Sequence, residues 1–203
     1  MISPAQIQTI AAHLLQGSVV ALPTETIYGL CCDPRQPNAL QKLFALKERD
    51  PAKPVLCITG QREQIDRLVE IPAQLKPILE QFWPGPLTVV LPLKDAASLA
   101  SLTTKTGTIA LRHSSDPLIR AITALTNFPI VATSANKSGE PFLQSAAEVR
   151  AQFGDALEMI IKTDHPLLQI PSTIIACSSQ GEIILIREGA IPWKDIADSS
   201  TSC

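Results

Sequence analysis

The sequence predicts a single α/β domain built around one mixed sheet. Apolar runs typical of buried strands alternate along the chain with segments that show helical apolar spacing and helix-start signals. Two late apolar runs are separated only by a turn at Gly181, so we expect antiparallel as well as parallel strand pairs. A chain of 203 residues, 45% of them hydrophobic, can build one hydrophobic core.

Helix-start signals organise the first half of the chain. Ser3, Pro4 and Gln6 supply an N-cap, a first-turn proline and a capping box, and Gly17 ends the helix that they begin. Further helices are expected over 36–47, 61–69 and 72–81. The strands expected here are SVVAL (18–22), PVLCI (54–58) and LTVVLP (87–92).

The second half continues the alternation. Asp116 is the expected N-cap of a helix that begins at Pro117, and Ser145 with Glu148 forms a capping box for a helix over 146–153. The expected strands are TIALR (108–112), FPIVAT (128–133), LEMIIK (157–162), STIIAC (172–177) and EIILIR (182–187). We expect one domain over residues 1–197 and a flexible tail over 198–203, because the end, ADSSTSC, is typical of a frayed terminus.

Charge, aromatic content and cysteine usage narrow the class of protein. A formal net charge of −2 argues against broad non-specific nucleic-acid binding, and 4% aromatic residues are too few for an extended base-stacking surface. The cysteines and histidines lack metal-ligand spacing, so we expect no protein-bound metal and reduced, mostly buried thiols. No apolar run reaches transmembrane length and the start lacks a signal-peptide pattern, which predicts a cytoplasmic protein without membrane association.

Polar side chains follow several of the expected strands, where open α/β sheets collect their ligands. They are Thr24, Glu25, Thr26 and Tyr28 in PTETIYG, Arg112 in TIALR, Thr133, Ser134 and Asn136 in VATSAN, and Arg187 in IILIR. Lys47, Arg49 and Lys53 lie close together in the proline-stiffened segment KERDPAKP. If these cations share one site, they call for a polyanion, most simply a nucleoside triphosphate.

Each of these features has a plainer explanation when it is taken alone. A strand-end arginine is usually a surface residue. Lys47 and Arg49 could be solvent-exposed cations that interact favourably with the dipole at a helix C-terminus, and TSANKSG could be an ordinary turn. The sequence contains no P-loop, no G-x-G-x-x-G fingerprint and no G-x-S-x-G elbow. The joint occurrence therefore indicates an α/β domain with a basic anion pocket, and nothing narrower.

Several blocks occur in a fixed order along the chain: PTETIYGL, LKERDPAKP, FWPGPLTVVLP, IALRHSSDPLIRAI, VATSANKSGEP, PSTII and ILIREGAI. The same order is found in the YrdC/TsaC family of threonylcarbamoyl-AMP synthases, which the chain resembles from about residue 4 to 192. The family signature K-x-R followed downstream by S-x-N is matched by Lys47, Arg49, Ser134 and Asn136. The resemblance implies a YrdC-like catalytic domain, with a twisted mixed sheet flanked by helices around a basic concave cavity.

The resemblance also implies a reaction. Such a nucleotidyltransferase joins L-threonine, bicarbonate or CO2, and ATP into threonylcarbamoyl-AMP and releases pyrophosphate, which starts N6-threonylcarbamoylation of adenosine-37 in tRNA. Mg²⁺ would accompany the nucleotide. The short form of the family hands its product to a separate tRNA threonylcarbamoyl transferase complex. Because the reaction brings anions together, fixed cations would supply much of the catalysis.

Residue roles follow from the same resemblance. The expected catalytic cations at the phosphates and the carbamate are Lys47, Arg49 and Lys53. The expected nucleotide ligands are Arg49, Lys53, Thr108, Ser134, Asn136 and Arg187, and the expected threonine ligands are Thr26, Arg112, Ala132 and Ser172. Arg112 would clamp the threonine carboxylate, and Tyr28 would wall the pocket. The chain departs from many relatives at Asp50, where they have proline, and at Ile58, where they have histidine.

Other functions remain open at this point. The same basic concavity could hold RNA, which makes an RNA-binding module the main alternative. A paralogue without activity is a third reading, against which the complete K-x-R and S-x-N signature argues. A relative of the riboflavin-pathway butanone-phosphate synthase would need acidic metal ligands, for which the sequence shows no candidates.

Overall fold

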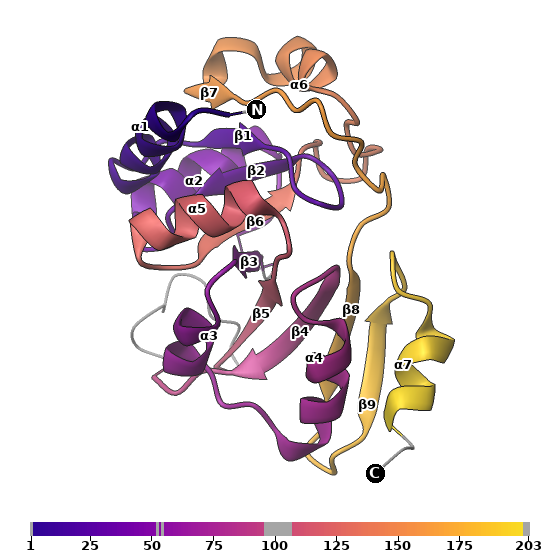
Figure 1. Cartoon of the computed structure of the whole chain (residues 1–203). Helices are drawn as coiled ribbons and strands as arrows, with labels where there is room; N and C mark the ends of the chain where they lie inside the picture. The colour runs from indigo at the N-terminus through magenta and orange to yellow at the C-terminus, as the bar shows by residue number, and fades with distance from the viewer. Residues whose placement is uncertain (1, 52, 54, 96–106, 201–203) are drawn as a thin grey trace.

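The computed structural model describes residues 2–51, 53, 55–95 and 107–200 (Figure 1). The first half holds α1 (Pro4–Leu15), β1 (Val20–Leu22), β2 (Gly29–Cys32), α2 (Pro37–Leu46), β3 (Leu56–Thr59), α3 (Arg62–Leu68), a short 3-10 helix (Ala73–Leu75), α4 (Lys76–Phe82) and β4 (Leu87–Pro92). The second half holds β5 (Thr108–His113), α5 (Pro117–Thr126), β6 (Ile130–Ser134), α6 (Ala146–Phe153), a second 3-10 helix (Gly154–Ala156), β7 (Met159–Ile160), β8 (Thr173–Cys177), β9 (Ile183–Arg187) and α7 (Trp193–Ser200).

The described strands form one mixed sheet in the order β7-β1-β2-β6-β3-β5-β4-β8-β9. The pairs β1–β7, β3–β5 and β4–β8 are parallel, and the remaining neighbours are antiparallel. The predicted mixed α/β fold is therefore confirmed. This order places β5, from the middle of the chain, in the interior of the sheet, between β3 and β4.

The predicted helix caps at Ser3, Asp116 and Ser145 form, but the predicted capping box at Ser145 is incomplete, because the Glu148 carboxylate accepts from the Gln144 N–H instead of the Ser145 N–H. Ser3 Oγ accepts a hydrogen bond from the Gln6 N–H at 3.3 Å, and Gln6 Oε1 accepts one from the Ser3 N–H at 2.9 Å. Asp116 Oδ1 accepts from two backbone N–H groups at the start of α5, at 2.8 and 3.2 Å. These bonds satisfy donors that a helix start otherwise leaves unpaired, which is why the predicted helix starts are accurate.

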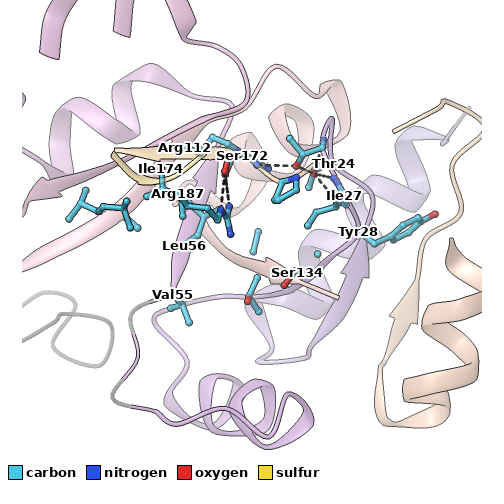
Figure 2. A pocket seen from close by; sticks show the side chains of 18 of the residues that line it. Thr24, Ile27, Tyr28, Val55, Leu56, Arg112, Ser134, Ser172, Ile174 and Arg187 are labelled. Carbon is cyan, nitrogen blue, oxygen red and sulfur yellow. Dashed lines mark hydrogen bonds between the residues drawn. The ribbon is translucent and has the colours of Figure 1, made fainter. Parts of the chain in front are cut away.

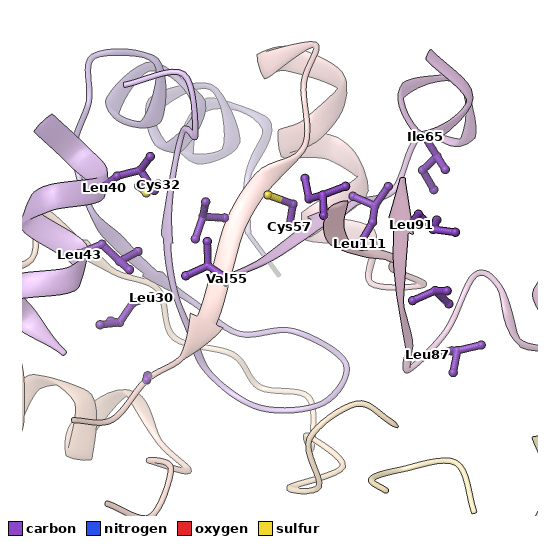
Figure 3. Packing of buried hydrophobic residues seen from close by; sticks show 14 of the residues in the cluster. Leu30, Cys32, Leu40, Leu43, Val55, Cys57, Ile65, Leu87, Leu91 and Leu111 are labelled. Carbon is purple, nitrogen blue, oxygen red and sulfur yellow. The ribbon is translucent and has the colours of Figure 1, made fainter. Parts of the chain in front are cut away.

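Two hydrophobic clusters lie on opposite faces of the sheet. On one face α1 and α5 pack together over β1, β2, β3 and β6, and Ile10, Leu14, Ile119 and Ile122 are fully buried there. The other face carries the larger cluster, to which α2, α3, α4, α6 and α7 contribute. Figure 3 shows part of it, from Leu40 and Leu43 of α2 to Leu87 and Leu91 of β4.

Two elements were not expected from the sequence. β2 is buried on both faces and begins at a glycine, so it shows neither polar alternation nor a typical strand composition. Helix α7 covers the first three positions of the segment expected to be a tail, because Ile196 is fully buried and Ser199 Oγ donates to Gln81 Oε1 at 2.6 Å. Residues 201–203 of that segment lie outside the described residues.

Three features bear on the predictions from composition. Cys31, Cys32 and Cys57 are buried free thiols and Cys177 is partly buried, whereas Cys203 lies outside the described residues. None of the helices in the described part of the chain combines the length and apolarity that crossing a bilayer requires. Across the same residues, His, Cys, Asp and Glu side chains do not gather into a group of three or more that could hold a metal ion.

Candidate active site

A cavity of about 330 Å³ opens beside α1 and α5 on the sheet face that those helices cover only in part. Its floor comes from β3, β4, β5 and β8, and its rim comes from the loops before β2 and after α2 and from the ends of β6 and β9 (Figure 2). It therefore gathers segments that are far apart in the sequence. The polar side chains that line it are Thr24, Thr26, Tyr28, Arg49, Thr108, Arg112, Thr133, Ser134, Ser172 and Arg187.

Arg112 forms the deepest charged part of this lining. Its residue is only 3% exposed, because β5 is central and β3 and β4 flank it on either side. Arg112 Nη1 donates to Thr26 Oγ1 at 3.1 Å, and Arg112 Nε lies 3.5 Å from Glu25 Oε1. Burial lowers the pKa of Arg112, and the charge of Glu25 offsets part of this effect.

Arg187 is held beside Arg112 by the backbone of Ser172. Arg187 Nη2 and Nε donate to the Ser172 carbonyl oxygen at 2.7 and 3.3 Å, and Nη2 lies 3.4 Å from Ser172 Oγ. Ser172 Oγ in turn shares a hydrogen bond of 2.7 Å with Thr88 Oγ1. The pKa of Arg187 is lowered by burial and, secondarily, by the charge of Arg112. Because the positive charges of Arg112 and Arg187 act on each other, an anion bound between them would be favourable.

The PTET segment is folded into a tight turn at the cavity edge. Thr24 Oγ1 donates to the Ile27 carbonyl at 2.8 Å and shares a hydrogen bond of 2.9 Å with Thr26 Oγ1. Behind the turn, Ser114 Oγ donates to Glu25 Oε2 at 2.7 Å. These bonds fix the hydroxyl of Thr26 toward Arg112, so the two residues can act on one ligand.

Arg49 and Ser134 approach the cavity from the opposite side, Arg49 on the loop after α2 and Ser134 at the end of β6. Both line the cavity, and burial lowers the pKa of Arg49. Ser134 Oγ donates to Asn136 Oδ1 at 2.6 Å. Arg49, Arg112 and Arg187 thus converge on one cavity from three elements, as the sequence predicts. None of the described residues that line this cavity carries a carboxylate, and Glu25, which pairs with Arg112, lies outside the lining.

The predicted site residues do not all reach the cavity. The lining contains Thr26, Arg49, Thr108, Arg112, Ala132, Ser134, Ser172 and Arg187. Within the described part of the chain, Lys47, Lys53 and Asn136 stand outside this lining. Lys47 is 1% exposed and bonded to oxygen atoms of the loop after β6, whereas Lys53 is exposed to solvent.

Sequence reasoning missed the apolar part of the lining. Val55, Leu56, Val90, Ala110, Ile174 and Ile186 form this apolar wall. Val90 and Ala110 alternate along their strands with residues of the opposite face that are also apolar, such as Val89 and Leu111, so period-two spacing gives no signal there. Ile58 is fully buried in the cluster under α1 and α5 and is not part of the described lining.

Comparison with known proteins identifies relatives of this domain. The Sua5_yciO_yrdC family model, described as telomere recombination, matches residues 12–189. The threonylcarbamoyl-AMP synthase of Chromohalobacter salexigens is 40% identical over 150 residues, which are 73% of this chain and 80% of that protein. The protein of the same name from Photobacterium profundum is 37% identical over 172 residues, 83% of this chain and 92% of that protein.

Solved structures share the fold. Pyrococcus abyssi Sua5 complexed with L-threonine matches with a TM-score of 0.88 at 31% identity, and the match covers 98% of this chain and 58% of that one. The chain therefore spans little more than half the length of the P. abyssi protein. Escherichia coli YciO matches with a TM-score of 0.85 over 96% of this chain and 94% of that one, at 20% identity, which shows the fold alone. Since the family model matches most of the chain, the chain belongs to the Sua5/YciO/YrdC family.

Proposed function

We propose that the chain is an L-threonylcarbamoyladenylate synthase, a nucleotidyltransferase that makes threonylcarbamoyl-AMP and pyrophosphate from L-threonine, bicarbonate and ATP. The observation that carries the proposal is the convergence of Arg49, Arg112 and Arg187 on one cavity without a lining carboxylate among the described residues. Relatives 37–40% identical to this chain bear the name threonylcarbamoyl-AMP synthase. The product would serve N6-threonylcarbamoylation of adenosine-37 in tRNA.

Threonine would bind at the buried end of the cavity. The guanidinium of Arg112 suits a carboxylate, and the hydroxyls of Thr26 and Ser172 offer short-range polar contacts beside it. Ala132, with its small side chain, leaves room there. The P. abyssi Sua5 structure was solved with L-threonine, which supports a threonine site in this fold.

ATP would occupy the open side of the cavity. Arg49 and Arg187 would neutralise phosphate oxygens, Thr108 and Ser134 would contact the nucleotide, and exposed Lys53 would join them from the segment after α2. Asn136 would act through its hydrogen bond with Ser134. Because no described lining residue offers a carboxylate, Mg²⁺ would enter on the nucleotide phosphates, where it would supply charge neutralisation.

The chemistry needs positioning and charge neutralisation more than a protein nucleophile. The amine of threonine takes up CO2 and loses a proton to give a carbamate. A carbamate oxygen then attacks the α-phosphorus, the bond to the bridging oxygen breaks, and pyrophosphate leaves with the electron pair. Arginines already fixed by hydrogen bonds, such as Arg112 and Arg187, need little reorganisation to stabilise this charge.

A pyrophosphate-release assay tests the proposal. With ATP and bicarbonate, release should require L-threonine and should be much weaker with L-serine. Release that is independent of threonine would contradict it. The RNA-binding alternative predicts RNA affinity that falls steeply with salt and no pyrophosphate release, and nothing in the named relatives favours it. Transfer of the product to a transferase complex and a cytoplasmic location remain predictions.

A further inference from the structure

Lys47 is a charged residue buried at the junction of two loops. It follows α2 directly, is 1% exposed and ranks among the largest fully buried side chains of the described residues. Its ammonium group meets the Ser134 carbonyl oxygen at 2.5 Å, the Asn136 carbonyl oxygen at 2.7 Å and Asn136 Oδ1 at 3.1 Å. An ammonium group has three N–H donors, so these three acceptors occupy all of them. In this arrangement Lys47 has no donor left for a phosphate.

The same two loops are joined at two further points. The Ser138 N–H donates to the Lys47 carbonyl oxygen at 2.8 Å, and Lys137 Nζ donates to Glu48 Oε1 at 2.6 Å. Glu48 has a φ of 49°, a left-handed conformation that needs support from its surroundings when the residue is not glycine. The chain reverses there between Lys47, which points into the protein, and Arg49, which lines the cavity.

The bonding at Asn136 extends the effect of Lys47 toward the cavity. Asn136 Oδ1 accepts from both Lys47 Nζ and Ser134 Oγ, and Asn136 Nδ2 donates to the Glu140 carbonyl oxygen at 2.6 Å. The amide therefore has one orientation that satisfies every partner. A buried ammonium group without acceptors is costly in free energy. The bonds from Lys47 to its three acceptors therefore favour the observed position of the turn over 134–140.

We propose that Lys47 is a positioning residue that clamps the 134–140 turn to the 47–49 segment and thereby sets Arg49 and Ser134 at the cavity, instead of binding the phosphates itself. The inference rests on the proposed synthase function for its catalytic consequence. It corrects the expectation that all three cations of KERDPAKP contact the phosphates or the carbamate. It is consistent with the absence of both Lys47 and Asn136 from the described lining of the cavity.

A crystal structure of the wild-type protein with a non-hydrolysable ATP analogue provides the direct test. We expect Lys47 Nζ to stay within hydrogen-bond distance of the Ser134 and Asn136 carbonyl oxygens while Arg49 contacts the phosphates. Movement of Nζ to a phosphate oxygen would overturn the inference. If no nucleotide binds, the proposed function fails, and the clamp is then judged by the exchange experiment below, which needs no ligand.

Substitutions separate the clamp from a phosphate ligand in the free protein. In Lys47→Met, amide hydrogen exchange over 134–140 should become at least about 10-fold faster, and pyrophosphate release should fall at least about 100-fold because Arg49 and Ser134 are displaced. Lys47→Arg should not restore activity, whereas at a phosphate site arginine would replace lysine well. Lys42→Met removes an exposed lysine of α2 as the matched control and should leave both measurements unchanged.

Two outcomes would refute the clamp even if the variants lose activity. Unchanged exchange over 134–140 in a folded Lys47→Met protein would show that the ammonium does not hold the turn. A Lys47→Arg protein with near wild-type turnover would show that a cation, and not its specific bonding, is required. Near-wild-type near-ultraviolet circular dichroism identifies the variants that are folded well enough for this comparison.

Discussion

Arg112 and Arg187 reach the cavity from strands β5 and β9, whereas Arg49 reaches it from the loop after α2. The strand-borne arginines are held by short local bonds, to Thr26 and to the Ser172 carbonyl oxygen, on a scaffold of backbone ladders. On the loop side the β2–β6 ladder ends at Ser134, which pairs with Gly29. Beyond that point the order comes from bonds between two loops, with buried Lys47 at their centre.

The difference teaches that two ways of fixing a cation coexist in one cavity. A central strand positions a side chain through its neighbours, so a threonine site built on it should be rigid. The loop pair is held by the Lys47 ammonium and by two weaker points of contact, from Ser138 and Lys137, so loss of the ammonium should loosen it. We therefore expect the nucleotide side to be the more sensitive to small changes. A change on the strand side of the cavity should therefore leave the loop side in place, and the reverse should also hold.

Removal of Arg112 should have the largest effect, because it damages binding and folding together. In Arg112→Gln, Glu25 loses its buried cationic partner, which should lower the free energy of unfolding by roughly 3 kcal/mol. Pyrophosphate release should fall by about 10²- to 10³-fold, with a higher KM for L-threonine. Thermal unfolding and steady-state kinetics measure both changes, and Arg150→Met on the exposed surface of α6 is the control. A stable variant with unchanged KM for threonine would place the threonine elsewhere.

Removal of Arg49 should slow the reaction strongly without unfolding the protein. We expect Arg49→Ala to release pyrophosphate about 100-fold more slowly, because a cation at the cavity is lost, while Tm stays within about 3 °C of wild type. Threonine binding, measured by calorimetry without ATP, should persist because Arg112 is untouched. A fully active Arg49→Ala enzyme would overturn the role of the loop side.

Ser172 offers a smaller test on the strand side. Ser172→Ala deletes the partner of Thr88 Oγ1, and Thr88 is fully buried, so the stability should fall by about 1–3 kcal/mol. The KM for threonine should rise because a hydroxyl contact is lost. The rise should be only several-fold, because the Ser172 carbonyl oxygen still holds Arg187. Adding Thr88→Val should recover part of the stability, because it removes the unpaired hydroxyl, but none of the threonine affinity. Recovery of both would show that the Ser172 hydroxyl is structural.

The sequence predicted most of the fold because helix starts and strand runs have local causes. The caps at Ser3 and Asp116 and the strand at 87–92 were located correctly for this reason. The sequence did not predict β2 and α7, because both depend on tertiary packing. β2 is a fully buried four-residue strand, and α7 is held by the burial of Ile196 in a core that local sequence patterns do not reveal.

The site was predicted in part. Polar residues at strand ends identified Arg112, Arg187 and Ser134 as converging residues, since the sheet order brings such ends together. Lys47 is not among the described lining residues, and its ammonium group bonds to backbone carbonyl oxygens, which charge alone cannot reveal. Whether a lysine faces a ligand or a backbone carbonyl depends on the path of a loop distant in sequence, here the turn over 134–140.

Alkaline pH should have the smallest effect, and it should change the loop side of the cavity but not the Arg112 side. Burial, and then the charge of Arg49, lowers the pKa of Lys47 to about 8, whereas an unfolded lysine keeps its ordinary value of about 10.4. Below pH 8 both states carry the proton, and the folded protein bears the full cost of the buried charge. As the pH rises above 8 the folded state releases its proton first, so the contribution of Lys47 to stability becomes more favourable until about pH 10.4.

The stability difference between wild type and Lys47→Met, followed by denaturant unfolding from pH 7 to pH 10, isolates this titration from that of every other group. It should shift in favour of the wild type across that range. Over the same range the protection of the 134–140 amides, corrected for intrinsic exchange rates, should fall, because a neutral amine offers one donor fewer to three acceptors. The Arg112 side should keep its protection, since a guanidinium stays protonated there. A stability difference that is flat with pH would mean that burial does not lower the pKa of Lys47.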